Sequence, residues 1–244
     1  MISSIFNIVL YKPLLNALVF FTMVIPGADV GLAIIILTVV VRFAILPLSS
    51  KALDAQVKMK ELEPRLKEIK EKHKDDRQEQ AKLTMALYKE KGMNPFSGII
   101  IAVIQIPILI ALYLVFSHGL PVKPELLYSF IHLPETLNFH FLGLLDLTTK
   151  NYFIAILSGV LQFYQMQLAI PALPKKQPGS APSMADDFAR SMNMNMRYVM
   201  PVMIAFIGFT LPSAIVLYWA TNNVFMIVHE LVRRKKKELQ TKTS

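Results

Sequence analysis

The sequence has no cysteine, one tryptophan and few charged residues for a chain of 244 residues. Without cysteine, disulfides, Cys-ligated zinc, iron–sulfur clusters and thiol nucleophiles are excluded. Charged residues make up only 18% of the chain, whereas roughly 25% is usual in a soluble protein. Apolar residues reach 54%, and the mean hydropathy is +0.45. This surplus favours burial in a lipid bilayer.

Sequence signatures of enzymes are also missing. The five histidines do not have the spacing of zinc ligands, and there is no G-x-S-x-G elbow, P-loop or pair of intramembrane aspartates. The apolar runs carry no carboxylate at depth, which a proton or ion pathway would need. We therefore expect no catalytic residue, no metal site, no cofactor and no specific nucleic-acid site, and a protein that is not an enzyme.

Long apolar runs with few or no charges are what the sequence has in abundance. A membrane-crossing helix needs about 20 apolar residues, and suitable runs cover residues 30–48, 96–116, 152–170 and 198–232. The last run is interrupted at 211–213, which indicates two helices. The first of these would cover only about 21 Å of a hydrocarbon core of about 30 Å. Either this helix begins earlier than residue 198 or the bilayer thins there.

The basic residues predict the orientation of these spans. Of the 26 Lys and Arg residues, 12 lie in 51–95, four in 171–197 and six in 233–244. Short cytoplasmic loops collect Lys and Arg, so these three segments are expected in the cytoplasm. The N-terminus is then outside, and residues 1–27 are predicted to form an amphipathic helix in the outer interface rather than a cleaved signal peptide.

Residues 51–95 differ in kind from the spans, because they hold 12 basic and nine acidic residues. Narrow apolar stripes on either side of a turn at 74–77 predict a helical hairpin that moves relative to the membrane part. A role in docking a partner is left open. The predicted fold is an all-α polytopic membrane protein with ten segments: an interfacial helix (1–27), spans at 28–50, 96–118, 151–171, 198–211 and 212–232, the hairpin (51–95), an outer loop (119–150), a cytoplasmic loop (172–197) and a basic tail (233–244).

Arg42 is the single most informative residue. It lies in the cytoplasmic half of an otherwise apolar span, where an Arg costs about 2.5–3.5 kcal/mol on insertion scales. No buried acid is available to pair with it, because Glu230 lies at a helix end. Arg42 could snorkel to the inner surface, but we favour a hydrated cavity that opens to the cytoplasm.

Other polar residues could line the same cavity. On the 152–170 helix, Ser158, Gln162 and Gln165 share one face, and Gln105 precedes a proline that frees a carbonyl. The alternative for each residue is an ordinary hydrogen bond between helices. Three residues of the last helix are predicted to serve packing and the interface: Trp219, Asn222 and Asn223.

The order of motifs resembles one known family. Along the chain stand V-V-R-F-A-I-L-P-L, L-E-P-R-L-K-E-I-K-E-K-H-K-D-D, M-N-P-F, I-Q-I-P-I-L-I-A-L-Y, F-Y-Q-M-Q, M-P-V-M and L-P-S-A-I-V-L-Y-W-A-T-N-N. Together they are similar to the YidC/Oxa-type membrane protein insertases, in the short bacterial form without the large extracytoplasmic domain. The likeness runs over almost the whole chain.

The resemblance implies a five-helix core around a hydrophilic groove with Arg42 at its centre, flanked by Gln105 and Gln165. It also implies a hydrophobic slide for substrate helices, at Ile106, Val202, Ile204, Ile207 and Leu211. The expected place is the bacterial inner membrane. The expected partners are nascent membrane proteins and lipid, with the ribosome and the Sec channel as candidates.

The predicted function is membrane protein insertion without nucleotide. Short polar tails would cross through the groove, and apolar segments would pass sideways into lipid. Two other classes remain open: a small channel or transporter, and a non-catalytic membrane scaffold.

Overall fold

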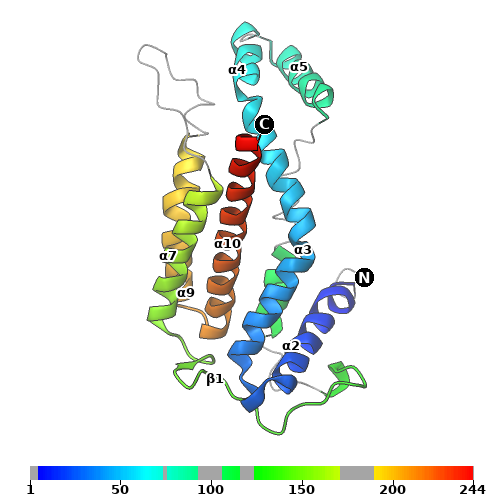
Figure 1. Ribbon diagram of the computed structural model, residues 1–244, viewed down its shortest axis with the longest axis vertical. Helices are drawn as coiled ribbons and strands as arrows, with labels where there is room; N and C mark the ends of the chain where they lie inside the picture. The colour runs from blue at the N-terminus through cyan, green and yellow to red at the C-terminus, as the bar shows by residue number, and fades with distance from the viewer. Residues whose placement is uncertain (1–4, 74–75, 93–105, 116–123, 171–189, 244) are drawn as a thin grey trace. The chain divides into compact units, whose positions relative to one another are not determined.

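The computed structural model of the chain describes residues 5–73, 76–92, 106–115, 124–170 and 190–243 (Figure 1). Helices dominate this part of the chain, and its two strands have two residues each, so the expected all-α class is confirmed. The chain divides into two compact units. One consists of Met1–Arg42 and Leu112–Ser244, and the other is Phe43–Ala111.

The first unit opens with a helix that turns back into a second one. A π-helical turn η1 (Asn7–Tyr11) continues into α2 (Lys12–Val24), and the short η2 (Pro26–Ala28) leads to α3 (Val30–Glu61). The Asp29 carboxylate starts α3, because its Oδ1 accepts hydrogen bonds from the backbone N–H groups of Gly31 and Leu32, at 2.7 and 3.0 Å. The inward face of α3 in this unit is a stripe at helical spacing: Val30, Ala33, Ile34, Leu37, Thr38 and Arg42.

The remainder of the first unit contains a small hairpin and a helical bundle. After η3 (Pro124–Leu126), strands β1 (His140–Phe141) and β2 (Leu145–Asp146) pair antiparallel. The helices that follow are α7 (Tyr152–Ala169), η4 (Asn195–Val199) with α9 (Met200–Gly208), and α10 (Ser213–Thr243). In Figure 1, α7, α9 and α10 lie side by side, and α7 contacts both of the others.

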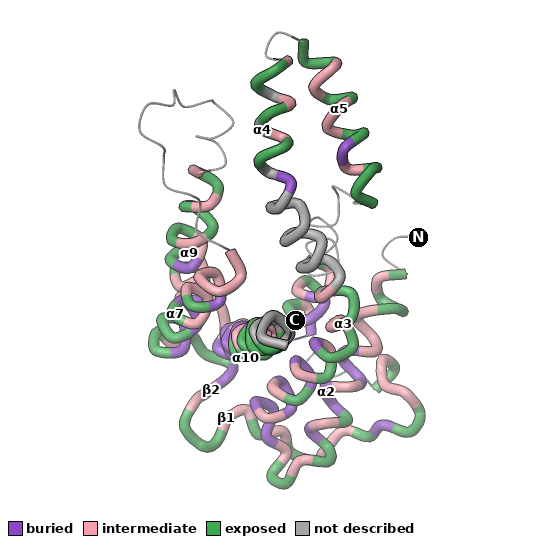
Figure 2. The backbone as a smooth tube through the Cα atoms, turned by 45° about the horizontal axis from the view of Figure 1, so that its top comes forward, coloured by how far each residue is buried: buried purple, intermediate pink, exposed green. Residues whose placement is uncertain are grey.

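Small residues allow α7 and α9 to approach closely. A Cβ atom on Gly159 of α7 would lie 2.8 Å from the Cβ of Ala205 on α9, and one on Gly208 would lie 3.0 Å from that of Ala155. Contacts of this kind between small residues are typical of membrane helix pairs, whose attraction comes from close packing rather than from the hydrophobic effect. Buried residues, coloured purple in Figure 2, are concentrated in the first turns of α10, from Ser213 to Ala220.

The second unit holds the charged helices. α4 (Glu63–Lys72) and α5 (Arg77–Glu90) contact each other, and the Asp76 side chain caps α5 by accepting from the N–H groups of Gln78 and Glu79. The expected boundary between span and hairpin, at residue 50, falls inside α3, which continues to Glu61. The reason is that Lys, Ala, Leu, Gln and Met in this segment are good helix formers.

Three helices of the described residues are long and apolar enough to cross a membrane by length and composition: Asn7–Val24, Val30–Leu48 and Ser213–Lys236. The first of them coincides with the predicted interfacial helix. Helix α7 has 18 residues, but its three glutamines lower its mean hydropathy. The apolar helix Ile106–Val115 is too short for this group. The rest of the predicted second span and most of the predicted 172–197 loop lie outside the described residues.

The helix that contains the predicted fourth span begins earlier than residue 198. Helical residues extend back from α9 through η4 to Arg190. From residue 190 to Gly208 the helical rise is about 28 Å. However, residues 190–197 are largely polar, so the apolar part of this helix remains short.

Candidate functional site

Arg42 is buried between two long helices of the first unit. The residue is only 9% exposed, and its Nε donates a hydrogen bond to Oδ1 of Asn222 on α10. The contact joins residues 180 positions apart. An Arg at this depth is costly unless its donors are satisfied. The neutral amide satisfies one donor and orients the guanidinium without removing its charge.

The neighbouring amide of α10 points to a different helix. Asn223 is buried, and its Nδ2 donates to the backbone carbonyl of Ser158 on α7, at 3.4 Å. The Ser158 side chain is fully buried, and its hydroxyl has no hydrogen-bond partner among the described residues. Adjacent amides on α10 therefore connect α3 on one side and α7 on the other, which forms a polar layer across an otherwise apolar bundle.

Gln165 lies on the inward face of α7. It is 9% exposed and is seven residues, or two turns, beyond Ser158 on the same face. Gln162, between them, is half-buried. Gln105 lies outside the described residues, so the structure says nothing about its place. Of the three predicted groove residues, Arg42 and Gln165 are thus buried in the first unit.

Sequence reasoning missed Asn222. The Asn222–Asn223 pair was predicted to serve packing and the interface, whereas Asn222 directly holds the side chain that defines the candidate site. The signal was present, since two consecutive amides in an apolar span carry the same desolvation argument as Arg42. What one sequence lacked was any indication that residues 42 and 222 are neighbours.

Glu230 is engaged near the end of the α10 span. Its carboxylate oxygens accept from Arg233 Nε at 3.0 Å and from Arg234 Nε at 3.1 Å. Arg234 also donates to the carbonyl of Leu168 in the last turn of α7. Eight residues separate Glu230 from Asn222, about 12 Å along the helix. This acid therefore belongs to the end of the bundle and not to the polar layer.

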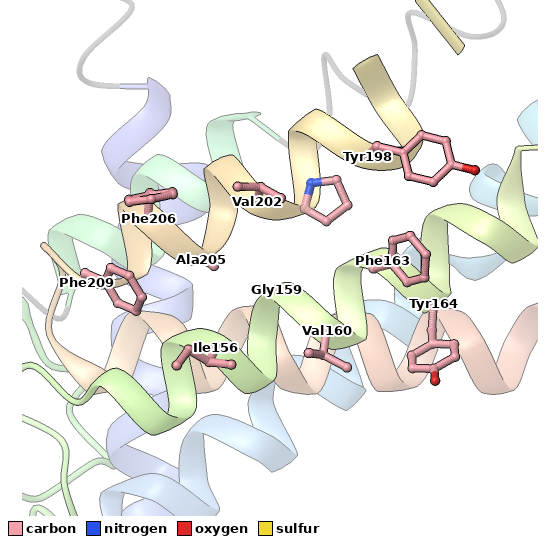
Figure 3. Close-up of a pocket in the computed structure, with 11 residues that line it drawn as sticks. Ile156, Gly159, Val160, Phe163, Tyr164, Tyr198, Val202, Ala205, Phe206 and Phe209 are labelled. Carbon is pink, nitrogen blue, oxygen red and sulfur yellow. The ribbon is translucent and has the colours of Figure 1, made fainter. Parts of the chain in front are cut away.

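A second feature of the first unit is an apolar groove between α7 and α9 (Figure 3). It has a volume of about 600 Å³. Gly159 and Ala205 meet at its middle, while aromatic rings lie towards its two ends (Figure 3). At one end, the rings of Phe163 and Tyr198 are 6.0 Å apart between centroids. The lining is almost wholly apolar, which suits a hydrocarbon chain or an apolar side chain.

The predicted slide residues of α9 do not all face this groove. Val202 and Ala205 line the groove. Ile204 lies two residues beyond Val202 and Ile207 two beyond Ala205, and residues two apart on a helix point to nearly opposite sides, so neither isoleucine lines it. Leu211 lies in the turn before α10, and it is half-buried. Ile106 belongs to the second unit, where it is exposed.

A family model described as "60Kd inner membrane protein" matches residues 20–241. The chain belongs to this family. The match includes Arg42, the polar layer and both helices of the apolar groove. The resemblance found from the order of motifs is thereby confirmed.

Curated relatives of the family carry the name "Membrane protein insertase YidC". The relative from Francisella philomiragia is 35% identical to the chain over 204 residues, which are 83% of this chain and 32% of that protein. The relative from Francisella tularensis subsp. novicida is 34% identical over the same share of both chains. The chain therefore spans about a third of the length of the relatives it matches.

No group of three or more His, Cys, Asp or Glu residues that could hold a metal ion occurs in the described part of this family member. The side chains that dominate its polar layer are amides and a guanidinium, which are hydrogen-bonding groups without nucleophilic character. The arrangement can bind and orient polar groups at depth.

Proposed function

We propose that the chain is a membrane protein insertase, which moves short polar tails of nascent membrane proteins through a hydrophilic groove and releases their apolar segments into lipid. The observation that carries this proposal is the burial of Arg42 against Asn222 within a membrane span. The names of the curated relatives support it. The predicted groove residues Arg42, Gln105 and Gln165 would be its polar lining.

The groove would shorten the dry path across the membrane. A polar tail in hydrocarbon pays several kcal/mol for each unsatisfied backbone group. A buried, oriented guanidinium attracts acidic groups of the tail more strongly than it would in bulk water, because the local dielectric is low. The apolar segment then partitions into lipid, and its burial supplies the driving force without nucleotide.

The apolar surface of α9 would guide the substrate's apolar segment. Val202, Ile204, Ile207 and Leu211, with Ile106 of the second unit, are the proposed slide. Exposure of Val202, Ile207 and Ile106 supports this role. The short apolar part of this helix would thin the bilayer locally, which lowers the remaining barrier for the tail.

The proposed topology has five spans, with the N-terminus outside and the C-terminus in the cytoplasm. In this arrangement α2 lies in the outer interface. The contacts of α2 support that position, because Asn16 donates from Nδ2 to the carbonyl of Leu126 at 2.9 Å and accepts from the N–H of Tyr128 at 2.7 Å. The other end of the same loop reaches the start of α3, where Val30 N–H donates to the Asn138 carbonyl. One loop thus contacts both α2 and the start of α3.

The charged helices α4 and α5 are the proposed docking site for partners. Most of the side chains described in these two helices are exposed or half-buried, and both helices contain few apolar residues. A cytoplasmic position would let them receive a nascent chain from a ribosome or stand beside the Sec channel.

The decisive experiment changes the charge at position 42. A small single-span protein with an acidic N-terminal tail would be inserted in vivo by the wild type and by Arg42→Lys, Arg42→Ala and Arg42→Glu. We expect insertion to fall in that order, with Glu lowest, because it repels the acidic tail. Normal insertion with Glu at position 42, at equal amounts of folded protein, would refute the electrostatic mechanism.

The same variants separate the two alternatives. A channel or transporter predicts solute or ion flux through liposomes that contain the purified protein. A scaffold predicts that deletion of residues 55–90 abolishes function while Arg42→Glu leaves it intact. The insertase predicts loss of insertion with Arg42→Glu and no flux.

A further inference from the structure

The tip of the hairpin between β1 and β2 is unusually apolar and exposed. Leu144 is 90% exposed and Leu142 is 61% exposed, with Gly143 between them. The tip is not frayed, because Gly143 N–H donates to the His140 carbonyl and Leu144 N–H to that of Phe141, both at 3.0 Å. A defined turn therefore presents two leucines outward.

The backbone of this turn would suit a different residue. Leu142 has φ +52° and Gly143 has φ +72°. Both lie in the left-handed region, which Gly, Asn and Asp adopt readily and Leu does not. Hairpin turns with positive φ at both central residues are usually built from Asn-Gly or Asp-Gly. Leu142 therefore has a strained backbone and an exposed apolar side chain. Strained backbone of this kind is concentrated at functional positions.

Hydrogen bonds fix the tip at the level where a membrane span begins. The N–H of Leu142 donates to Oδ2 of Asp29 at 2.9 Å, while Oδ1 of the same carboxylate caps the first turn of α3. The ring of Phe141 lies against Gly31, where a Cβ atom would meet it at 2.5 Å. The apolar span of α3 starts at Val30. Leu142 is thus hydrogen-bonded to the residue that directly precedes the apolar span of α3, and Leu144 lies two residues further along the same turn.

Two more helices of the same unit begin beside this loop. The carbonyls of Leu147 and Thr149 accept from the N–H groups of Ala214 and Ser213 in the first turn of α10. Helix α7 starts at Tyr152, and its first-turn rings Tyr152 and Phe153 are exposed. Aromatic residues gather at the membrane–water interface. The loop therefore lies at one end of three helices, at interface depth.

We propose that the hairpin tip, residues 142–144, inserts Leu142 and Leu144 into the headgroup–acyl boundary of the lipid bilayer. The occupant of this apolar tip is lipid, because the loop that carries the tip is hydrogen-bonded to the first turns of two apolar helices, α3 and α10, that are long enough to cross a membrane. The insertion anchors the loop that caps α3 and α10, and so fixes the depth of the polar layer. It does not depend on the proposed function.

The test uses tryptophan as a depth probe in the full chain. Because Trp219 is the only tryptophan, Trp219→Phe provides a silent background. Leu144→Trp would be reconstituted into nanodiscs of phosphatidylethanolamine and phosphatidylglycerol, with or without brominated acyl chains. Thr136→Trp, an exposed polar position of the same loop, is the matched control. Wild-type Trp219 serves as the reference inside a span.

We expect brominated lipid to quench the fluorescence of Leu144→Trp at least twofold more than that of Thr136→Trp. Iodide in the buffer should instead quench Thr136→Trp more than Leu144→Trp. Quenching of Leu144→Trp by iodide alone would overturn the proposal, because the tip would then face water. Protection of this variant from both quenchers would overturn it as well, since a second copy or another protein would then cover the tip. Unchanged melting of each variant shows that the fold is intact.

Discussion

At the scale of single residues, the contact between Arg42 and Asn222 carries the candidate site. A guanidinium and an amide form a hydrogen bond whose net worth is about 1.5–3 kcal/mol when one partner is charged. Its main effect here is to orient a charge inside an apolar bundle. Asn223, one residue further, bonds a backbone carbonyl of α7 and provides a natural comparison.

Asn222→Ala is expected to lower the rate of substrate insertion severalfold, because Arg42 loses the group that orients it. Asn223→Ala is the matched control and should affect the melting temperature more than insertion. A double-mutant cycle between positions 42 and 222 measures the coupling, which we expect to be about 1 kcal/mol or more. Additive effects would contradict a direct role for this contact.

Gly159→Leu is expected to separate α7 from α9, because even a Cβ atom there lies 2.8 Å from that of Ala205. Overpacking of this kind typically costs about 1–3 kcal/mol. Thermal unfolding in detergent measures the effect. Val160→Leu, at an exposed neighbouring position, should leave the melting temperature unchanged. An equal loss in both variants would show that bulk, rather than the close contact, is responsible.

At the scale of elements, the loop 124–151 organises the ends of the helices. It bonds to α2 through Asn16, to α3 through Asp29 and Asn138, and to α10 through Thr149. The turn after β2 is itself capped by Asp146, whose Oδ1 accepts from the N–H and the hydroxyl of Thr148. Polar side chains thus hold a segment that has almost no regular secondary structure.

The Asp146 turn should resist acid. The side-chain and backbone hydrogen bonds from Thr148 lower the pKa of the Asp146 carboxyl. Because its folded value lies below the unfolded value of about 3.9, the carboxylate stabilises the turn above that pH and ceases to do so as the pH falls through the folded value. In a hydrogen-exchange experiment from pH 6 downward, the Thr148 amide should lose its protection only below the ordinary pKa of an aspartate, about 3.9. In Asp146→Asn, this pH dependence should disappear.

At the scale of the whole molecule, the proposed topology assigns a side of the membrane to each segment. The absence of native cysteine makes single-cysteine labelling direct. We expect Thr136→Cys and Asn7→Cys to react with a membrane-impermeant maleimide from the outside, and Lys82→Cys from the cytoplasm only. The reason is that the proposed topology places α2 in the outer interface and α5 in the cytoplasm. Labelling of Asn7→Cys from the cytoplasm would show instead that Asn7–Val24 crosses the membrane.

The sequence by itself determined the solvent of this protein and its class. Uncharged runs of about 20 residues require a bilayer, and segregation of the basic residues predicts an orientation. It also singled out Arg42, because a charge in an apolar run is visible without any knowledge of its neighbours. The order of short motifs was enough to recognise the family.

Only the tertiary structure decided which polar residues meet. The hydrogen bond from Arg42 to Asn222 spans 180 residues, and no periodicity in one sequence encodes such a pairing. The same holds for the Asp29 carboxylate, which serves a helix start and a hairpin 113 residues away. The length of α3 is a further case, since the helix continues to Glu61 because helix propensity persists where hydrophobicity stops. Local pattern fixes which residues must avoid water or lipid, whereas packing alone selects their partners.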